Sequence, residues 1–213
     1  MRQVKLFVAS ALLVAGAAQA DEGMWTFHNV PTGAIKQKYG VDVTPAWLDH
    51  VRKSTIRLSS CTASFVSPNG LILTNFHCSW ACLDENSTKE KSLLDDGYRA
   101  ENREKEIKCQ TQVADVLVGY EDVTAKVAAA AKGQDDKTAN ETRKKTRTQI
   151  EQACEQASKK DRKTGPLKCE TVELYQGGQY YLYKYKRYDD VRLVFAPENA
   201  IGQFGGDPDN FQF

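Results

Sequence analysis

The sequence has no dominant charge. Its 29 lysines and arginines nearly balance its 28 aspartates and glutamates, which leaves a formal net charge of +1. General nucleic-acid binders need a basic excess, because they neutralise phosphates with Lys and Arg. We therefore expect no nucleic-acid partner. The chain has 213 residues, 41% of them hydrophobic, so it can bury a core and is not wholly disordered.

The sequence also has no second apolar run long enough to cross a membrane. The one candidate opens the chain: MRQVK carries two positive charges, LFVASALLVAGA is apolar, and AQA places small residues just before Asp21. This pattern is typical of a secretory signal peptide, residues 1–20, cleaved after Ala20. The apolar run is shorter than the roughly 20 residues that a membrane helix needs. We expect the mature chain, residues 21–213, in the periplasm or outside the cell, without a membrane span.

Cys-x2-Cys pairs, which often form half of a structural zinc site, are absent as well. All six cysteines lie in the mature part, and an even number in an oxidising compartment favours disulfides over zinc. The predicted bridges are Cys61–Cys78, from the hairpin described next, and Cys82–Cys109 and Cys154–Cys169, from proximity in the sequence.

Local patterns predict the elements of the first half. Thr44 can cap a short helix over residues 44–54. Two apolar runs, TASFV and LILT, flank SPNG at residues 67–70, and Asn-Gly after proline is a strong hairpin signal. The far ends of the two strands lie close together in a hairpin, so Cys61 and Cys78 are geometrically suited to a bridge.

The second half changes character twice. Residues 123–160 are rich in Ala, Lys, Glu, Gln, Arg and Thr, and a break at Gly133 divides them into two predicted helices. The residues expected on one face of the second helix are Ile150, Ala153, Cys154 and Ala157. From residue 168 on the sequence is β-rich. Its run YYLYKYKRY interleaves basic and aromatic residues, as some single-stranded nucleic-acid binders do. In a neutral, exported chain we interpret it as a sheet with tyrosines packed on one face.

His77, in GLILTNFHCSWAC, has three interpretations. As a metal ligand it would join Cys78 and Cys82, which are zinc-binding residue types. Against this, adjacent residues on a strand point to opposite faces. As a core histidine it would have no chemical role. As a catalytic base it would have to lie about 2.6–3.2 Å from a hydroxyl nucleophile, and a strand end pinned by a disulfide can hold it there.

Three sequence blocks carry a resemblance that favours the catalytic interpretation. A hairpin ending in Thr-x-x-His-Cys, with an upstream cysteine, is similar to chymotrypsin-like β-barrels. CTASFVSPNGLILTNFHC resembles the hairpin of the bacterial dipeptidyl-peptidases of serine peptidase family 46, the dipeptidyl-peptidase 7 and 11 type. VRLVFAPENAIGQFGGDPDNFQF resembles a second block of that family, and MWTFHNVP resembles its first. The middle, about residues 83–188, matches only loosely.

The resemblance implies roles for single residues. His77 aligns with the family's general base, and Phe76 replaces a preceding histidine. Asn210 and Phe211 align with an Asn-Trp pair that helps bind the free amino terminus of the substrate; Phe keeps an aromatic ring but lacks the indole N–H. The family's triad Asp and its Ser, in Gly-x-Ser-Gly, lie further along, and no Gly-x-Ser-Gly occurs here. We therefore expect the native protein to continue past Phe213 and this fragment to be inactive alone.

The predicted fold is mainly β with added helices: part of a chymotrypsin-like double β-barrel with a helical hairpin inserted at about residues 123–160. The predicted function of the full-length product is that of an exported serine-type dipeptidyl-peptidase, an aminopeptidase acting on peptides with a free N-terminus. No metal or organic cofactor is required, and a homodimer of the full-length protein is compatible with the resemblance. The alternative is a non-catalytic exported binding or structural protein derived from a peptidase barrel, which the missing Ser and Asp favour.

Overall fold

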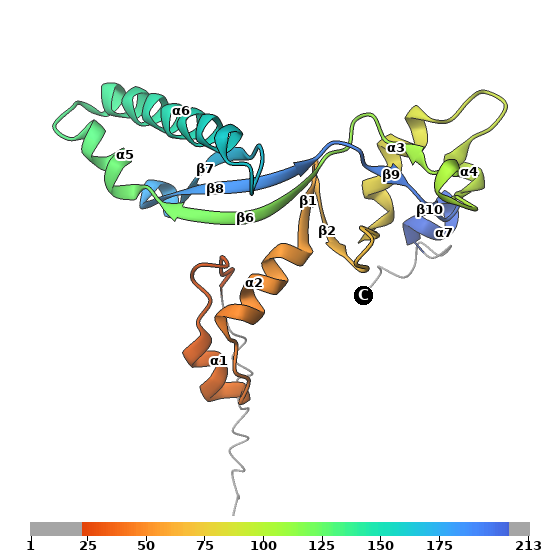
Figure 1. Ribbon diagram of the computed structural model, residues 1–213, viewed down its shortest axis with the longest axis horizontal. Helices are drawn as coiled ribbons and strands as arrows, with labels where there is room; N and C mark the ends of the chain where they lie inside the picture. Colours follow the sequence, from red (N-terminus) through yellow and green to blue (C-terminus); the bar gives the residue numbers. More distant parts are fainter. Residues whose placement is uncertain (1–22, 205–213) are drawn as a thin grey trace, which may run out of the picture.

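A computed structural model describes residues 23–204 of the chain (Figure 1). The predicted signal peptide and the predicted substrate-binding residues Asn210 and Phe211 lie outside the described residues. Within residues 23–204, no helix is both long enough and apolar enough to cross a membrane.

A six-stranded antiparallel sheet forms the middle of the molecule, with the strand order β3-β2-β1-β6-β8-β7. The strands are β1 (Thr55–Leu58), β2 (Cys61–Phe65), β3 (Ile72–Thr74), β6 (Ala114–Asp122), β7 (Lys168–Leu174) and β8 (Gln179–Tyr188). β6 and β8 are long and extend across Figure 1 from the helical side toward the opposite end. Their register shifts between Leu117 and Gly119. Such an irregularity increases the local twist and bends a sheet.

The hairpin predicted around SPNG is confirmed. β2 and β3 pair antiparallel, with Ala63 opposite Thr74. The hydroxyl oxygen of Ser67 accepts hydrogen bonds from the backbone N–H groups of Asn69 and Leu71, at 3.3 and 3.1 Å. A serine that satisfies the backbone in this way favours a tight turn over continued strand.

Two helices cover one face of β7 and β8, as predicted for residues 123–160 (Figure 1). They are α5 (Thr124–Ala131) and α6 (Asp136–Lys160). The side chain of Asp135 caps α6 by accepting hydrogen bonds from the N–H groups of Lys137 and Thr138, both at 3.2 Å. This cap satisfies two N–H groups that lack a partner within the helix.

The predicted buried face of α6 is only partly correct. Ile150 and Ser158 are buried and Cys154 is half-buried, whereas Ala153 and Ala157 are exposed. The buried residues follow spacings of four, which is the stripe that a straight helix presents to a sheet. The sequence pattern placed the two alanines on this stripe because small apolar residues are compatible with either face.

The tyrosines of β8 lie on both faces of the sheet. Tyr180 is buried beneath the helices, while Tyr181, Tyr183 and Tyr185 share the opposite face. His28, from the amino-terminal segment, stacks on Tyr181 with ring centroids 3.8 Å apart. The expected packing of tyrosines on one face therefore holds for alternate residues of the run, as the two-residue period of a strand requires.

Charged side chains join four neighbouring strands on that same face. Asp115 is buried and accepts two hydrogen bonds from Arg187, both at 2.8 Å, and one from Arg57 at 3.2 Å. Arg57 also pairs with Glu170 and lies over the Tyr185 ring, 4.3 Å from its centroid. Burial of Asp115 acts to raise its pKa, but the hydrogen bonds from the two arginines outweigh burial and lower that pKa.

The amino-terminal arm has two helices, α1 (Thr32–Tyr39) and α2 (Pro45–Ser54). Thr44 caps α2, as predicted, by accepting a hydrogen bond from Trp47 N–H at 3.2 Å. Arg52 of α2 is buried and donates to the carbonyl oxygen of Leu117 in β6, which ties the arm to the sheet.

Small elements pack at the other end of the sheet. They are the helices α3 (Trp80–Glu85), α4 (Leu93–Asp96) and α7 (Asn199–Phe204), and the two-stranded pairs β4 (Tyr98–Arg99) with β10 (Phe195–Ala196) and β5 (Ile107–Lys108) with β9 (Arg192–Leu193). An antiparallel sheet with added helices is the predicted fold class, although the helices contribute more of the chain than "mainly β" implies.

The described residues form three small apolar cores rather than one large core. One lies under α5 and α6, one lies on the central strands around Ile56, and one joins α3 and α4 to β9 and β10. The structure forms the disulfides Cys61–Cys78, Cys82–Cys109 and Cys154–Cys169, the same pairs that the sequence analysis names. Small cores are commonly reinforced in this way, because a bridge lowers the conformational entropy of the unfolded chain.

Candidate active site

His77 lies in a short turn rather than on a strand. β3 ends at Thr74, and the chain then forms a 3-10 helix, Phe76–Ser79, which we call the His77 turn. The N–H of Cys78 donates to the carbonyl oxygen of Asn75 at 3.1 Å, and the Ser79 hydroxyl donates to that of Phe76 at 2.6 Å. The sequence-based placement of His77 on the strand was therefore wrong by a few residues.

The His77 turn is held in place at Cys78, through the side chain and the backbone of this residue. The Cys78 side chain is bonded to Cys61 at the start of β2, with the two Cα atoms 6.0 Å apart. The Cys78 carbonyl oxygen accepts a hydrogen bond from the buried side chain of Gln112, at 2.9 Å. Because a covalent bond and a buried hydrogen bond act on adjacent groups, the backbone beside His77 has little freedom.

The side chain of His77 is exposed. The interpretation as a buried core histidine is therefore wrong. Within residues 23–204, no side chain hydrogen-bonds the imidazole ring. The ring is open to a reactant while its backbone is fixed, an arrangement that suits a general base.

The metal interpretation depends on the oxidation state of the cysteines. The potential ligand atoms of Cys61, His77 and Cys78 all lie within 4.8 Å of one another. The two sulfurs are bonded to each other, however, and zinc binds cysteine as the thiolate. The oxidised chain thus offers only one ligand here, the imidazole of His77. His77 and Cys78 do not point to opposite faces of a strand, because both lie in a 3-10 turn.

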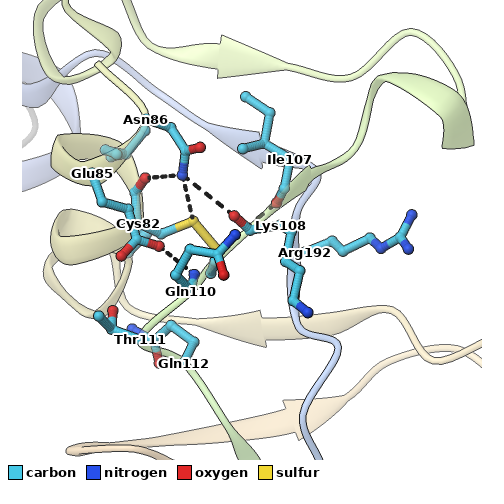
Figure 2. The surroundings of a disulfide bond; sticks show 12 residues. Cys82, Glu85, Asn86, Ile107, Lys108, Gln110, Thr111, Gln112 and Arg192 are labelled. Carbon is cyan, nitrogen blue, oxygen red and sulfur yellow. Dashed lines mark hydrogen bonds between the residues drawn. A yellow bond between two sulfur atoms is a disulfide. The ribbon is translucent and has the colours of Figure 1, made fainter. Parts of the chain in front are cut away.

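A second disulfide supports the residues that follow the His77 turn. Cys82 of α3 is bonded to Cys109, just after β5 (Figure 2). The side-chain amide of Asn86 donates to the carbonyl oxygens of Cys82 and Lys108, at 2.8 and 3.4 Å. Glu85 accepts from the N–H of Gln110 on the same side. These contacts hold α3 against β5 and so fix the carboxyl end of the His77 turn.

Sequence reasoning missed two contributors to this site. Gln112 gave no signal, because a single glutamine in the stretch Thr111-Gln112-Val113 matches no motif. The second is Gly202 of α7, which touches the Phe76 ring directly. Asn210 and Phe211 follow α7 in the sequence and lie outside the described residues.

Comparison with known proteins agrees with these observations. The family described as Peptidase S46 matches residues 20–213. An Asp/Glu-specific dipeptidyl-peptidase of Shewanella putrefaciens is 32% identical over 97% of this chain and 28% of its own length. A dipeptidyl-peptidase 7 of Capnocytophaga gingivalis is 28% identical over 95% of this chain and 28% of its own.

Solved structures give the same picture of the fold. The crystal structure of Porphyromonas endodontalis DPP11 in complex with substrate superposes with a TM-score of 0.72 at 24% identity, covering 90% of this chain and 29% of that one. The chain therefore spans less than a third of the length of the relatives that it matches.

Proposed function

The chain belongs to the Peptidase S46 family, and from this premise we propose that it is the amino-terminal part of a serine-type dipeptidyl-peptidase. The enzyme would release dipeptides from peptides with a free amino terminus. The observation that carries the proposal is the setting of His77. It is exposed, in a turn fixed by the Cys61–Cys78 bridge, at the position that the family resemblance gives to the general base.

In the proposed reaction, His77 takes the proton of a serine hydroxyl while the serine oxygen attacks the carbonyl carbon of the second peptide bond of the substrate. The imidazolium then gives this proton to the leaving amine, so that the C–N bond breaks and a dipeptidyl ester of the serine remains. The same imidazole then deprotonates a water that attacks the ester carbonyl, and the imidazolium returns this proton to the serine oxygen as the dipeptide leaves. We assign the serine and the orienting aspartate to the family sequence beyond residue 213.

The rigid backbone beside His77 supports this role. A general base works only within about 2.6–3.2 Å of the proton that it accepts, and an ångström of displacement can cost about a hundredfold in rate. The disulfide at Cys78 and the Gln112 hydrogen bond restrict such displacement before the substrate binds.

Asn210 and Phe211 are the proposed residues for the substrate's terminal amine. The amide oxygen of Asn210 would accept a hydrogen bond from the ammonium group, and the Phe211 ring would form a wall beside it. The proposal extends to dipeptide release and not to a side-chain preference, because the similar relatives include both Asp/Glu-specific and dipeptidyl-peptidase 7 types.

The deciding experiment uses the full-length product of the reading frame. Chromogenic dipeptidyl substrates with a free amine should be cleaved, and the same substrates with an acetylated amine should not. His77→Ala should lower kcat by roughly 10³-fold or more, because the base and nucleophile act as a unit. His50→Ala is the matched control, since His50 is an exposed histidine on α2, and its kcat should stay at the wild-type value.

A fluorophosphonate probe gives a second readout. It should label the wild-type enzyme at one serine, and His77→Ala should prevent that labelling. Full-length protein that is neither labelled nor active would instead favour the alternative, a non-catalytic exported protein with a peptidase-like fold.

Export is a separate part of the proposal. We place the signal peptide at residues 1–20 and the amino-terminal part of the peptidase domain at residues 21–213, with residues 123–160 as a helical insertion. The three disulfides support an oxidising destination. Amino-terminal sequencing of the purified protein should begin at Asp21; a protein that retains Met1 in the cytoplasm would contradict this part.

A further inference from the structure

The Cys61–Cys78 bridge and His77 form one cluster of potential metal ligands. The two sulfurs and an imidazole nitrogen all lie within 4.8 Å of one another. Zinc binds a cysteine sulfur at about 2.3 Å and a histidine nitrogen at about 2.0–2.1 Å, so two ligands of one tetrahedral ion lie roughly 3.5–3.8 Å apart. Once the bond between the sulfurs is open, the three atoms therefore need only small shifts to surround a single ion.

The surroundings of this bridge differ from those of the other two. Cys61 is half-buried, so a dithiol can reach the bridge from solvent. Within residues 23–204, neither of the other disulfides has a third His, Cys, Asp or Glu ligand at such a distance. Opening the Cys61–Cys78 bridge therefore creates a metal site, and opening either of the others does not.

Non-covalent contacts keep the ligands together when the bridge is open. On the side of Cys61, β2 and β3 are paired, and the Thr74 hydroxyl donates to a carbonyl oxygen of β2 at 2.9 Å. On the side of Cys78, Gln112 donates to the Cys78 carbonyl oxygen and the Ser79 hydroxyl closes the turn. None of these contacts involves a sulfur, so the open form presents a preformed set of ligands, which lowers the cost of binding an ion.

We propose that Cys61, His77 and Cys78 form a Zn²⁺ site when a dithiol reduces the bridge, and that zinc bound there blocks the general base. The blocking of the base rests on the function proposed above, whereas the metal site does not. The structure thus assigns to the bridge a second role besides holding the His77 turn: it keeps zinc away from the imidazole.

The reduction and the binding balance as follows. One thiolate of the dithiol attacks a sulfur of the bridge, its second thiolate resolves the mixed disulfide, and the dithiol leaves as its own disulfide after giving two electrons. Zn²⁺ then replaces the protons of the two new thiols, and the two thiolates cancel its charge. A neutral imidazole has one nitrogen with a free lone pair, and the ion takes it. His77 can then no longer accept the proton of a serine hydroxyl.

The metal site is tested in the full-length protein, with Co²⁺ as a spectroscopic substitute for Zn²⁺. Protein reduced by a phosphine should bind Co²⁺ and show a thiolate-to-cobalt charge-transfer band, which Zn²⁺ should remove. The oxidised protein should show no such band. His77→Ala should weaken Co²⁺ binding by at least about tenfold, since even an outer-shell partner of a metal ligand contributes about 10–100-fold. His50→Ala, at an exposed histidine of α2, is the matched control and should bind as the wild type does.

Cysteine variants assign the band to one bridge. Cys61→Ser/Cys78→Ser should abolish the charge-transfer band, although four cysteines remain. Circular dichroism follows the fold of each reduced protein. Two control variants each remove a different bridge and should keep the band: Cys82→Ser/Cys109→Ser and Cys154→Ser/Cys169→Ser. The second control replaces the first if the first does not fold.

Blocking of the base is tested by dipeptide release from a chromogenic substrate. Saturating zinc should lower kcat of the reduced enzyme by at least about a hundredfold, because a positioned base contributes about 10²–10⁴-fold. A chelator should restore kcat, and zinc should leave the oxidised enzyme unchanged. The activity that remains in reduced Cys61→Ser/Cys78→Ser should not respond to zinc.

Three outcomes would overturn the metal site: a folded reduced protein without the band, a band that survives Cys61→Ser/Cys78→Ser, or a reduced protein that unfolds before it binds cobalt. Equal zinc inhibition of the oxidised and the reduced enzyme would overturn the blocking of the base. Failure of the proposed function would look different, because the oxidised wild-type enzyme would release no dipeptide. The cobalt titration would still decide whether the site exists.

Discussion

Two regions of the molecule contain cores of equal size that are built in opposite ways. The helix-covered region, residues 123–188, has six buried residues in its core and one disulfide. The His77 region, residues 76–109 and 191–204, also has six; the Cys82–Cys109 disulfide lies within it, and Cys78 bridges it to Cys61. The first has a helix of 25 residues and strands of seven and ten, whereas every strand of the second has two residues.

The difference shows where the stability of each region comes from. Long helices and strand ladders supply many cooperative backbone hydrogen bonds from one continuous stretch of sequence. The His77 region has few such bonds and joins two distant stretches. It therefore depends on its covalent bridge and on single close contacts, such as the one between Phe76 and Gly202. The proposed catalytic base therefore lies in the region whose strands are shorter and whose stability depends more on disulfides and single contacts.

The largest expected effect comes from removing one disulfide at a time. Replacing Cys82 and Cys109 by Ser should destabilise the chain by about 3 kcal/mol. Amide exchange should show lost protection through residues 76–109 and retained protection in α6. Replacing Cys154 and Cys169 is the matched variant, and it should leave α6 largely protected because its helix and ladder remain. Equal loss of protection in both regions would remove the distinction between them.

Core truncation should be the next largest effect. Val127 of α5 is completely buried, so Val127→Ala should lower the free energy of unfolding by about 2 kcal/mol. Val66, which directly follows β2, is 53% exposed, so Val66→Ala should cost less than about 0.5 kcal/mol. Urea unfolding followed by circular dichroism measures both. An equal loss of unfolding free energy in the two variants would mean that the helix-covered core is less closely packed than its burial indicates.

Low pH should destabilise the sheet that joins the two regions. The pKa of Asp115 is lowered in the folded chain, because hydrogen bonds from Arg187 and Arg57 outweigh its burial. Its contribution is thus present above the unfolded pKa of about 3.9 and is lost as the pH falls through the lower folded pKa. Asp115→Asn should flatten the loss of stability that the wild-type chain shows as the pH falls below about 4, as urea unfolding at a series of pH values would measure. Asp42→Asn, at an exposed position, should retain the wild-type slope.

The smallest effect belongs to a helix cap. Asp135→Ala removes the acceptor for two N–H groups at the start of α6 and should cost about 1 kcal/mol. Gln156→Ala, at an exposed position within the same helix, should change stability by less than about 0.5 kcal/mol. Thermal melts at 222 nm compare the two. Equal midpoints would show that the start of α6 frays without consequence for the rest of the region.

The comparison also explains what the sequence could and could not predict. The hairpin around SPNG, the cap at Thr44 and the two helices of residues 123–160 rest on neighbouring residues, so local patterns identified them. The two-residue strands form only because distant stretches meet, and no pattern of two residues can indicate this. The burial of α6 was predicted only in part, since Ala153 is equally suited to water and to a core.

The candidate site likewise combines features that neighbouring residues determine with features that depend on distant parts of the chain. His77 and its bridge were found because the histidine and both cysteines lie within one short stretch of sequence. The 3-10 turn was not predicted, since the groups that hold it, Cys61 and Gln112, lie outside the turn in the sequence. The contact with Gly202 joins residues more than a hundred positions apart, and only the folded chain brings them together.

The order of the three disulfides has a consequence for how the protein is made. The bridges join Cys61 to Cys78, Cys82 to Cys109 and Cys154 to Cys169. Each cysteine is therefore bonded to a cysteine next to it in sequence order, and no bridge encloses another. If the chain is exported as proposed above, an oxidase that joins thiols two by two, in the order in which they leave a translocation channel, would make the native set without reshuffling. Production of the folded protein should therefore need a thiol oxidase and tolerate the loss of a disulfide isomerase.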